Sequence, residues 1–148
     1  MSELNDRSIF GSFEYVSFPH LGVESAIAKV DTGAFSGALH CSLIEEYIRE
    51  SDGKTVLRFI PSANRKHITE IDDYETVTVR SSNGHEEERY LISTEIIVKK
   101  KSYPITIGLS NRSKMSTEVL LGRRFLRENN VLVDTRINQE LDEVSGGK

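Results

Sequence analysis

The stretch Glu24–Ala34 reads ESAIAKVDTGA, and it begins with the alternation of apolar and polar residues that is typical of a half-buried β-strand. Ala26, Ala28 and Val30 fall on one side of such a strand. The polar tripeptide Asp31-Thr32-Gly33 follows directly at the end of the strand. Asp and Gly are also common in tight turns for conformational reasons alone. The tripeptide by itself therefore favours an ordinary turn, and a chemical role for its carboxylate needs support from elsewhere in the chain.

A second informative stretch is Val119–Asp134, which reads VLLGRRFLRENNVLVD. Its apolar start leads into Gly122, and Arg123–Asn129 has the pattern of a short helix that stops at the pair of asparagines. Val131–Asp134 then predicts a final strand. The segment thus predicts the order strand, glycine, short helix, strand near the C-terminal end.

The rest of the chain is dominated by short period-2 runs separated by Gly, Asn, Asp and Pro, which indicates a small all-β barrel or sandwich. Asn83-Gly84 suits a type I′ hairpin turn, and Lys99–Lys101 suits another hairpin end. One further helical stretch of one or two turns is predicted within Ser42–Glu50. The remaining predicted strands are Phe13–Phe18, Thr55–Ile60, Glu75–Arg80, Arg89–Val98, Tyr103–Leu109 and Glu118–Leu121.

Length and composition indicate one ordinary globular domain. The chain has 148 residues, of which 37% are hydrophobic and 28% charged. We expect a single domain over residues 1–148, with a core at about residues 9–136, a loose tail at 137–148 and a loose start at 1–8. No apolar run approaches the roughly 20 residues of a membrane helix, and no secretory signal begins the chain, so we expect a cytoplasmic protein. The single cysteine, Cys41, excludes an internal disulfide, and we expect it to be buried and inert.

The net charge of −4 hides a basic segment, Lys99–Arg127, which holds eight basic residues and one acidic residue. Such a segment could attract nucleic acid or an acidic ligand. Aromatic side chains for base stacking are sparse within it, with only Tyr103 and Phe125, so we expect no nucleic-acid partner.

Taken together, the two informative stretches resemble aspartic peptidases of the retropepsin type. In that family a strand ends in Asp-Thr/Ser-Gly-Ala, and a later apolar-apolar-Gly-Arg segment opens a single helix. DTGAFSGALHC, VRSSNGHEEERYLIST, IGLSNRSKM and VLLGRRFL also look like the bacterial and archaeal group labelled ATP-dependent zinc proteases, associated with the ATP-grasp glutamate ligase RimK. The resemblance covers about Ala26 to Asp134. It implies an all-β, retropepsin-like acid protease barrel with one short C-terminal helix, and a hydrolase of peptide bonds without a cofactor. It further implies a peptide or protein substrate with a poly-glutamate tail and an ATP-grasp ligase as partner.

The same resemblance implies that Asp31, Thr32, Gly33 and Ala34 form the catalytic motif. Hydrolysis by this route needs two carboxyl groups that share one proton, one accepting a proton from water while the other donates to the carbonyl oxygen. This chain has one Asp-Thr-Gly, because Asp134-Thr135-Arg136 lacks the glycine. We therefore expect a homodimer with one Asp31 from each chain at the two-fold axis.

Residues that line the substrate cleft are also implied. Phe35 and Ser36 follow the motif, although Phe35 would equally suit the core. Ser81–Glu88 is a candidate for the flap hairpin that closes over substrate, although Glu86-Glu87-Glu88 makes it unusually acidic and an ordinary turn is a close rival. A poly-glutamate substrate requires basic groups in the cleft. The substrate-binding set that we predict is Phe35, Ser36, His85, Arg89, Arg112 and Lys114.

Two other interpretations stay open. A retropepsin fold can serve as a non-catalytic binding or adaptor domain, and a metal-dependent hydrolase is the second alternative. A zinc peptidase helix needs His-Glu-x-x-His, whereas residues 85–89 read HEEER and end in arginine. We therefore expect no metal site.

Overall fold

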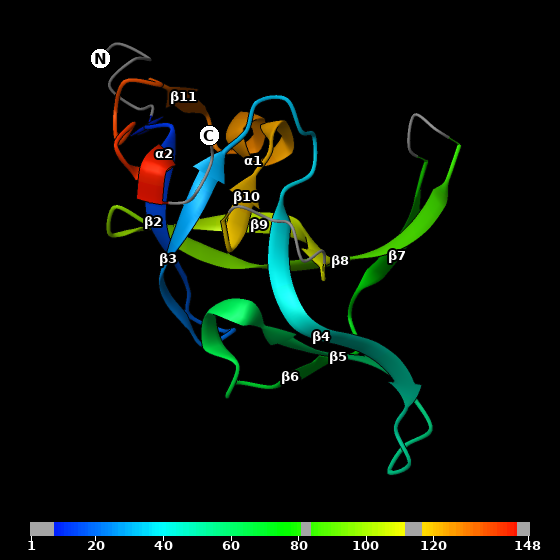
Figure 1. The fold of residues 1–148 in the computed structure, drawn as a ribbon. Coiled ribbons are helices and arrows are strands. Elements are labelled where there is room, and N and C mark those ends of the chain that lie inside the picture. Colours follow the sequence, from blue (N-terminus) through cyan, green and yellow to red (C-terminus); the bar gives the residue numbers. More distant parts are fainter. Residues whose placement is uncertain (1–7, 81–83, 112–116, 145–148) are drawn as a thin grey trace.

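The computed structural model describes residues 8–80, 84–111 and 117–144, and it consists mainly of β-strands (Figure 1). The elements in chain order are β1 (Ser8–Phe10), β2 (Phe13–Phe18), β3 (Val23–Val30), β4 (Ala38–Ile48), β5 (Thr55–Pro61), the 3-10 turn η2 (Ser62–Asn64), β6 (Thr69–Ile71), β7 (Glu75–Arg80), β8 (Glu86–Val98), β9 (Lys101–Ser110), β10 (Val119–Leu121), α1 (Arg123–Glu128), β11 (Val131–Val133) and α2 (Leu141–Val144).

Six strands close into a barrel in the order β10-β3-β2-β8-β9-β4, because β4 pairs back onto β10. Closure removes the exposed edges that an open sheet would present. Apolar side chains fill the interior, and Phe18, Ile96, Ile107 and Leu121 are among those that are completely buried. Ala26, Ala28 and Val30 of β3 are buried as the alternating pattern predicts. The prediction of an all-β barrel is confirmed.

The short strand β10 lies between two strands that are consecutive in the chain. It pairs parallel with β3 on one side and antiparallel with β4 on the other. The connection from β3 to β4, residues 31–37, must therefore cross the end of β10. The backbones approach closely there, since a Cβ added to Gly37 would lie 2.3 Å from the carbonyl oxygen of Leu120. The crossing thus requires glycine at position 37.

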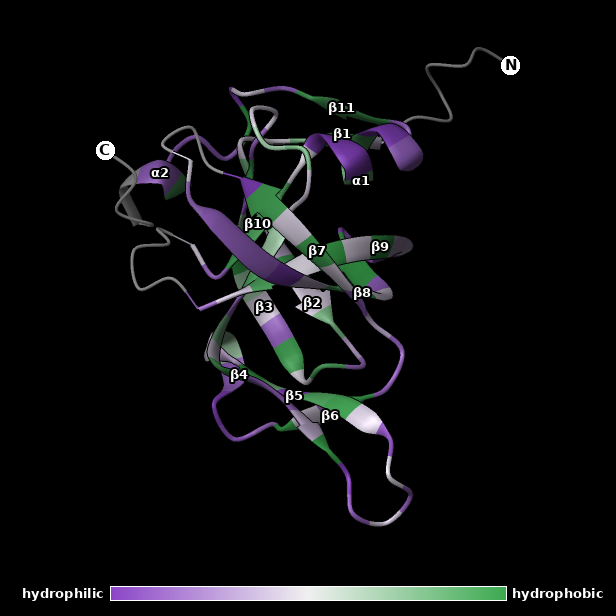
Figure 2. Cartoon of the chain, turned by 90° about the vertical axis from the view of Figure 1, so that its right-hand side faces the viewer, coloured by the Kyte–Doolittle hydropathy of each residue, from purple (hydrophilic) through white to green (hydrophobic). Residues whose placement is uncertain are grey.

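Three additions surround the barrel. The outer half of β4 continues into an antiparallel sheet with β5 and β6, and β7 pairs with the first half of β8 as a hairpin (Figure 1). The strands β1 and β11 form a separate parallel pair, which joins the start of the described chain to its C-terminal part. Figure 2 shows this pair next to α1, at one end of the molecule.

Most sequence-based predictions of secondary structure agree with the structure within two or three residues. The helix after Gly122 is α1, and the glycine is its N-cap residue. Lys99 and Lys100 have φ values of 51° and 69° between β8 and β9, which is the geometry of the predicted hairpin end. The hairpin of β7 and β8 is also present, but the turn type proposed for Asn83-Gly84 depends on residue 83, which lies outside the described residues.

Two predictions are wrong. Ser42–Glu50 is not helical, because residues 43–48 pair one by one with residues 55–60 of β5, and this pairing outweighs the local helical pattern. The tail is not loose throughout 137–148. The backbone of Ile137 accepts a hydrogen bond from the Ser12 N–H, and Leu141 is buried. Residues 1–7 and 145–148 lie outside the described residues.

No helix within residues 8–80, 84–111 and 117–144 is long and apolar enough to cross a membrane.

The crossing at Gly37 gives a prediction about stability. Gly37→Ala should lower the free energy of unfolding by about 2 kcal/mol or more, because both atoms in the clash are held by backbone. Chemical denaturation at fixed protein concentration measures the change. The matched control is Gly53→Ala, where φ is +72° and no atom lies within 4 Å, so only the conformational cost of about 1 kcal/mol remains. Equal losses in the two variants would contradict the close approach.

Candidate functional site

The loop after β3 holds the Asp31 carboxylate in a defined direction. The Asp31 N–H donates to the carbonyl oxygen of Leu121 at 2.9 Å, which continues the ladder between β3 and β10. The Gly33 N–H then donates to Oδ1 of Asp31 at 2.9 Å. A Cβ at position 33 would lie 3.1 Å from that same oxygen, tighter than an ordinary contact. Glycine at this position therefore lets the backbone amide reach the carboxylate.

The start of helix α1 fixes the second half of the loop. The first amides of a helix have no partner within the helix. Here the Arg123 N–H donates to the Ala34 carbonyl at 2.8 Å and the Arg124 N–H donates to the Phe35 carbonyl at 3.0 Å. A Cβ on Gly122 would lie 2.5 Å from the Phe35 oxygen, so the helix can approach this closely only with glycine at its N-cap.

Arg123 adds a side-chain contact that the sequence-based site did not include. Its Nη1 donates to the Thr32 carbonyl at 3.0 Å, and its guanidinium carbon lies 5.8 Å from the centre of the Phe35 ring. The signal available in the sequence was its position directly after Leu-Leu-Gly. Backbone and side-chain contacts from one short helix thus hold the carbonyls of Thr32, Ala34 and Phe35.

The loop faces outward at the end of the barrel. Asp31 and Ala34 are half-buried, whereas Thr32 and Gly33 are exposed. Phe35 is 51% exposed, so it is not a core residue. The pair of strands β1 and β11 lies at the same end of the molecule (Figures 1 and 2). Ile9 and Leu132, which are partners in that pair, are 48% and 39% exposed.

A pocket of about 250 Å³ lies between this loop and the β7–β8 hairpin. The loop contributes residues 34–37, and the inward side of the hairpin contributes Arg89 together with apolar side chains. The Arg89 side chain is 26% exposed, and its nearest acidic group is the Glu87 carboxylate at 3.9 Å. The pocket is therefore apolar with one basic group. Its lining is Ala34, Phe35, Ser36, Gly37, Val77, Val79, Arg89, Leu91 and Gly108.

The structure thus brings together Phe35, Ser36 and Arg89 of the predicted substrate-binding set. His85 is exposed near the tip of the hairpin and does not line this pocket. Arg112 and Lys114 lie outside the described residues. Sequence reasoning missed the two valines of β7, because only the register of the hairpin shows which of its residues face the loop.

Two other kinds of chemistry, a cysteine nucleophile and a metal site, find no support in the described residues. Cys41 is buried, and burial raises the pKa of its thiol to about 12, so it is neutral near pH 7 and unsuited to act as a nucleophile. Among the described residues, no group of three or more His, Cys, Asp or Glu side chains is arranged to hold a metal ion.

Comparison with known proteins places this geometry in context. A solved structure from Legionella pneumophila, described as a protein of unknown function, superposes with a TM-score of 0.65 and 27% sequence identity, covering 88% of this chain and 95% of the other. Proteins named alpha-L-glutamate ligases from Shewanella pealeana and Desulfotalea psychrophila are each 32% identical, and the matches cover 88% and 98% of this chain. The chain spans only 29% and 32% of the length of these two relatives.

The family model described as retropepsin-like aspartic endopeptidase RimB matches residues 9–140, which include the β3 loop, the β7–β8 hairpin and α1. The closed barrel, with the short helix α1 directly after β10, agrees with that family's fold as predicted from the sequence. The chain therefore belongs to the RimB-like family of retropepsin-like aspartic endopeptidases.

Proposed function

We propose that this protein hydrolyses peptide bonds as an aspartic peptidase, with one Asp31 carboxylate from each chain of a homodimer. The observation that carries the proposal is the position of the carboxylate. It is half-buried at the outward end of the barrel, its Oδ1 accepts the Gly33 amide, and a pocket for a side chain lies beside its loop. Family membership makes peptide hydrolysis the expected chemistry of such a carboxylate.

In this proposal the reaction needs only water and the two carboxyl groups. Two carboxylates about 3 Å apart cannot both ionise, so they share one proton. The ionised Asp31 takes a proton from the attacking water, while its protonated partner donates to the carbonyl oxygen of the scissile bond. The tetrahedral intermediate then breaks its C–N bond as the amide nitrogen takes the proton that Asp31 received from water, and one hydroxyl of the intermediate returns a proton to the partner carboxylate as the product carboxylic acid forms. Gly33 steadies Oδ1 during these transfers and leaves Oδ2 for the water and the second carboxyl group.

A second copy of the chain supplies the missing half of this site. The described part of the chain holds one such loop, and it lies at the same end of the molecule as the β1–β11 pair (Figures 1 and 2). Ile9, Phe35 and Leu132 are apolar surface that a two-fold contact would remove from water. The exposed Thr32 would lie nearest the axis, where its hydroxyl holds the two loops together.

For the substrate, we propose the poly-glutamate tail of a protein. Arg89 places a guanidinium in an otherwise apolar pocket beside the loop, and arginine binds carboxylates through two parallel hydrogen bonds. The aliphatic part of a glutamate side chain would contact Val77 and Val79. The names of the relatives, alpha-L-glutamate ligases, support a substrate that contains glutamate. The β7–β8 hairpin serves as the flap over this tail.

The length of those relatives favours a second function for the same domain. The chain matches less than a third of each, so the rest of each relative is additional protein. A domain of this kind would bind an ATP-grasp glutamate ligase in the cytoplasm, whether or not it hydrolyses the tail. A domain that only binds the ligase would not require Asp31, which the next experiment tests.

Replacing Asp31 should abolish hydrolysis without unfolding the protein. Asp31→Asn keeps the Gly33 hydrogen bond but cannot accept the proton of water, so the rate should fall at least about 100-fold. The measurement is mass spectrometry of a peptide ending in several glutamates. Asp134→Asn is the matched control, because Asp134 also follows a strand but its carboxylate pairs with Arg136. Full activity of Asp31→Asn would contradict the proposal.

Arg89 should determine the preference for acidic side chains. Arg89→Gln should reduce kcat/KM for a peptide with glutamate at the cleaved bond about tenfold, and should leave a glutamine analogue nearly unchanged. Arg80→Gln is the control on the same hairpin, since Arg80 is exposed, pairs with Glu86 and does not line the pocket. Equal losses for the two peptides would assign Arg89 a structural role instead.

A further inference from the structure

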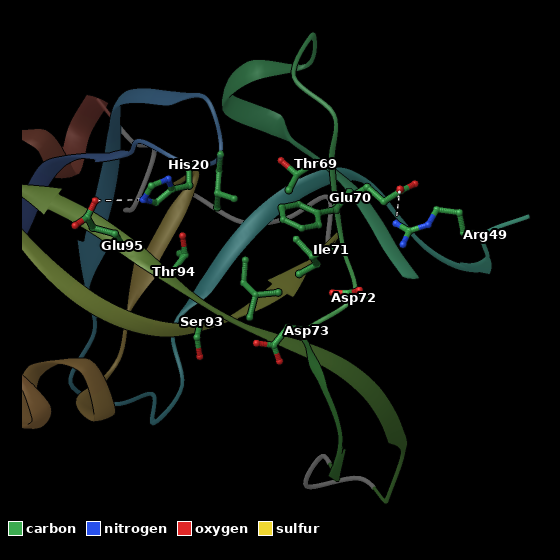
Figure 3. Close-up of a pocket in the computed structure, with 13 residues that line it drawn as sticks. His20, Arg49, Thr69, Glu70, Ile71, Asp72, Asp73, Ser93, Thr94 and Glu95 are labelled. Carbon is green, nitrogen blue, oxygen red and sulfur yellow. Dashed lines mark hydrogen bonds and ion pairs between the residues drawn. The ribbon is translucent and has the colours of Figure 1, made fainter. Parts of the chain in front are cut away.

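A larger groove, of about 560 Å³, lies at the other end of the barrel, and we name it the β6–β8 groove (Figure 3). One wall is residues 69–73, which form β6 and the start of the link to β7. The opposite wall is residues 92–95 in the middle of β8, and the turn between β2 and β3 closes one side with His20 and Leu21. The strand β3 separates this turn from Asp31, and its eight residues span roughly 25 Å.

Both walls of the groove are strand edges without a partner strand. On the side facing away from β9, β8 pairs with β7 up to Leu91 and with β2 from Ile97 onward. Among the described residues, no strand pairs with residues 92–96 on that side. Of the strands that the structure describes, β5 alone pairs with β6, so within them the outer edge of β6 is also unpaired. The groove opens where the chain that leads into β7 diverges from β8.

Unpaired edges present backbone N–H and C=O groups that an extended peptide can satisfy by adding a strand. The groove lies between two such edges, which is the arrangement that receives an inserted strand. Its apolar lining is the half-buried Ile71, with the buried Phe59 and Ile92 behind it, so alternate side chains of an inserted strand would meet the apolar surface of Ile71.

The rim of the groove is acidic. Four carboxylates line it, from Glu70, Asp72, Asp73 and Glu95, against the single guanidinium of Arg49, which leaves a charge of −3 with His20 neutral. Arg49 already pairs with Glu70 at 3.2 Å, and Asp72 lies 3.6 Å from Lys54. The Asp73 carboxylate is exposed and has no ion-pair or hydrogen-bond partner within the described part of the chain. The rim therefore favours a cationic ligand.

We propose that the β6–β8 groove binds an extended peptide segment of a partner protein, with alternating basic and apolar side chains, as an added β-strand. The backbone of the segment pairs with the free edges of β6 and β8. Its apolar side chains contact Ile71, and its lysine or arginine side chains reach the carboxylates of Asp72, Asp73 and Glu95. Because the β6–β8 groove shares no residue with the pocket between the β3 loop and the β7–β8 hairpin, this binding does not depend on hydrolysis.

The test uses a fluorescein-labelled peptide of seven residues that alternates lysine and valine, with binding followed by fluorescence anisotropy. The unmodified protein should bind this peptide, and the double variant Asp72→Asn, Asp73→Asn should bind it about tenfold more weakly. The double variant Glu128→Gln, Glu140→Gln removes the same charge from exposed residues outside the groove and should change binding less than twofold. A peptide with glutamate in place of lysine should not bind.

A second peptide tests the added strand itself. N-methylation of every second residue removes backbone donors and keeps the charge, so it should weaken binding about tenfold. Amide hydrogen exchange should also slow at residues 92–96 on addition of the unmodified peptide. The proposal is overturned if the unmodified peptide does not bind, if the N-methylated peptide binds equally well, or if the control variant loses as much affinity as the groove variant.

Discussion

The amides of Arg123 and Arg124 donate to the carbonyls of Ala34 and Phe35, and this contact between the first turn of α1 and the β3 loop governs the architecture. It is possible only because β10 lies between β3 and β4, so that the loop must cross the strand that leads into the helix. Gly37 and Gly122 allow the two backbones to meet at the crossing. Backbone N–H groups that have no partner within the helix thereby hold the loop that carries Asp31.

A loop fixed in this way holds its carboxylate in a defined direction, and under the proposed mechanism it forms half of a site. Asp31 is held at Oδ1 and its surroundings are exposed, so one chain offers a single positioned carboxylate. The two-carboxyl chemistry that we propose requires a second chain, for which the exposed apolar residues at the same end would be the contact surface. The β7–β8 hairpin adds the side-chain pocket and its one guanidinium. The residues around the site therefore come from three segments that are distant in the sequence, namely the β3 loop, the β7–β8 hairpin and α1. The barrel brings these segments to one end of the molecule.

The sequence predicted those parts that depend on local pattern. The alternation before Asp31 and the Leu-Leu-Gly-Arg segment indicated β3, β10 and α1, and the three-residue strands β1 and β6 are too short to give a periodic signal. The apolar residues at positions 43, 44, 47 and 48 have the spacing of one helix face. Their pairing with the strand β5 makes them a β-strand instead. The role of Val77 depends on the register of the hairpin, which no local pattern reveals. The Leu-Leu-Gly-Arg segment marked the position of Arg123, but its contact with the Thr32 carbonyl depends on a crossing between distant segments.

The central claim is that two chains share one pair of carboxyl groups, and mixed dimers test it most directly. Wild-type protein is mixed with increasing amounts of the Asp31→Asn variant under conditions that allow exchange of subunits, and hydrolysis of a glutamate-ended peptide is measured. If the pair spans the dimer, mixed dimers are inactive, and activity per total protein falls with the square of the wild-type fraction. A strictly linear fall would mean that each chain cleaves on its own, and would contradict the account.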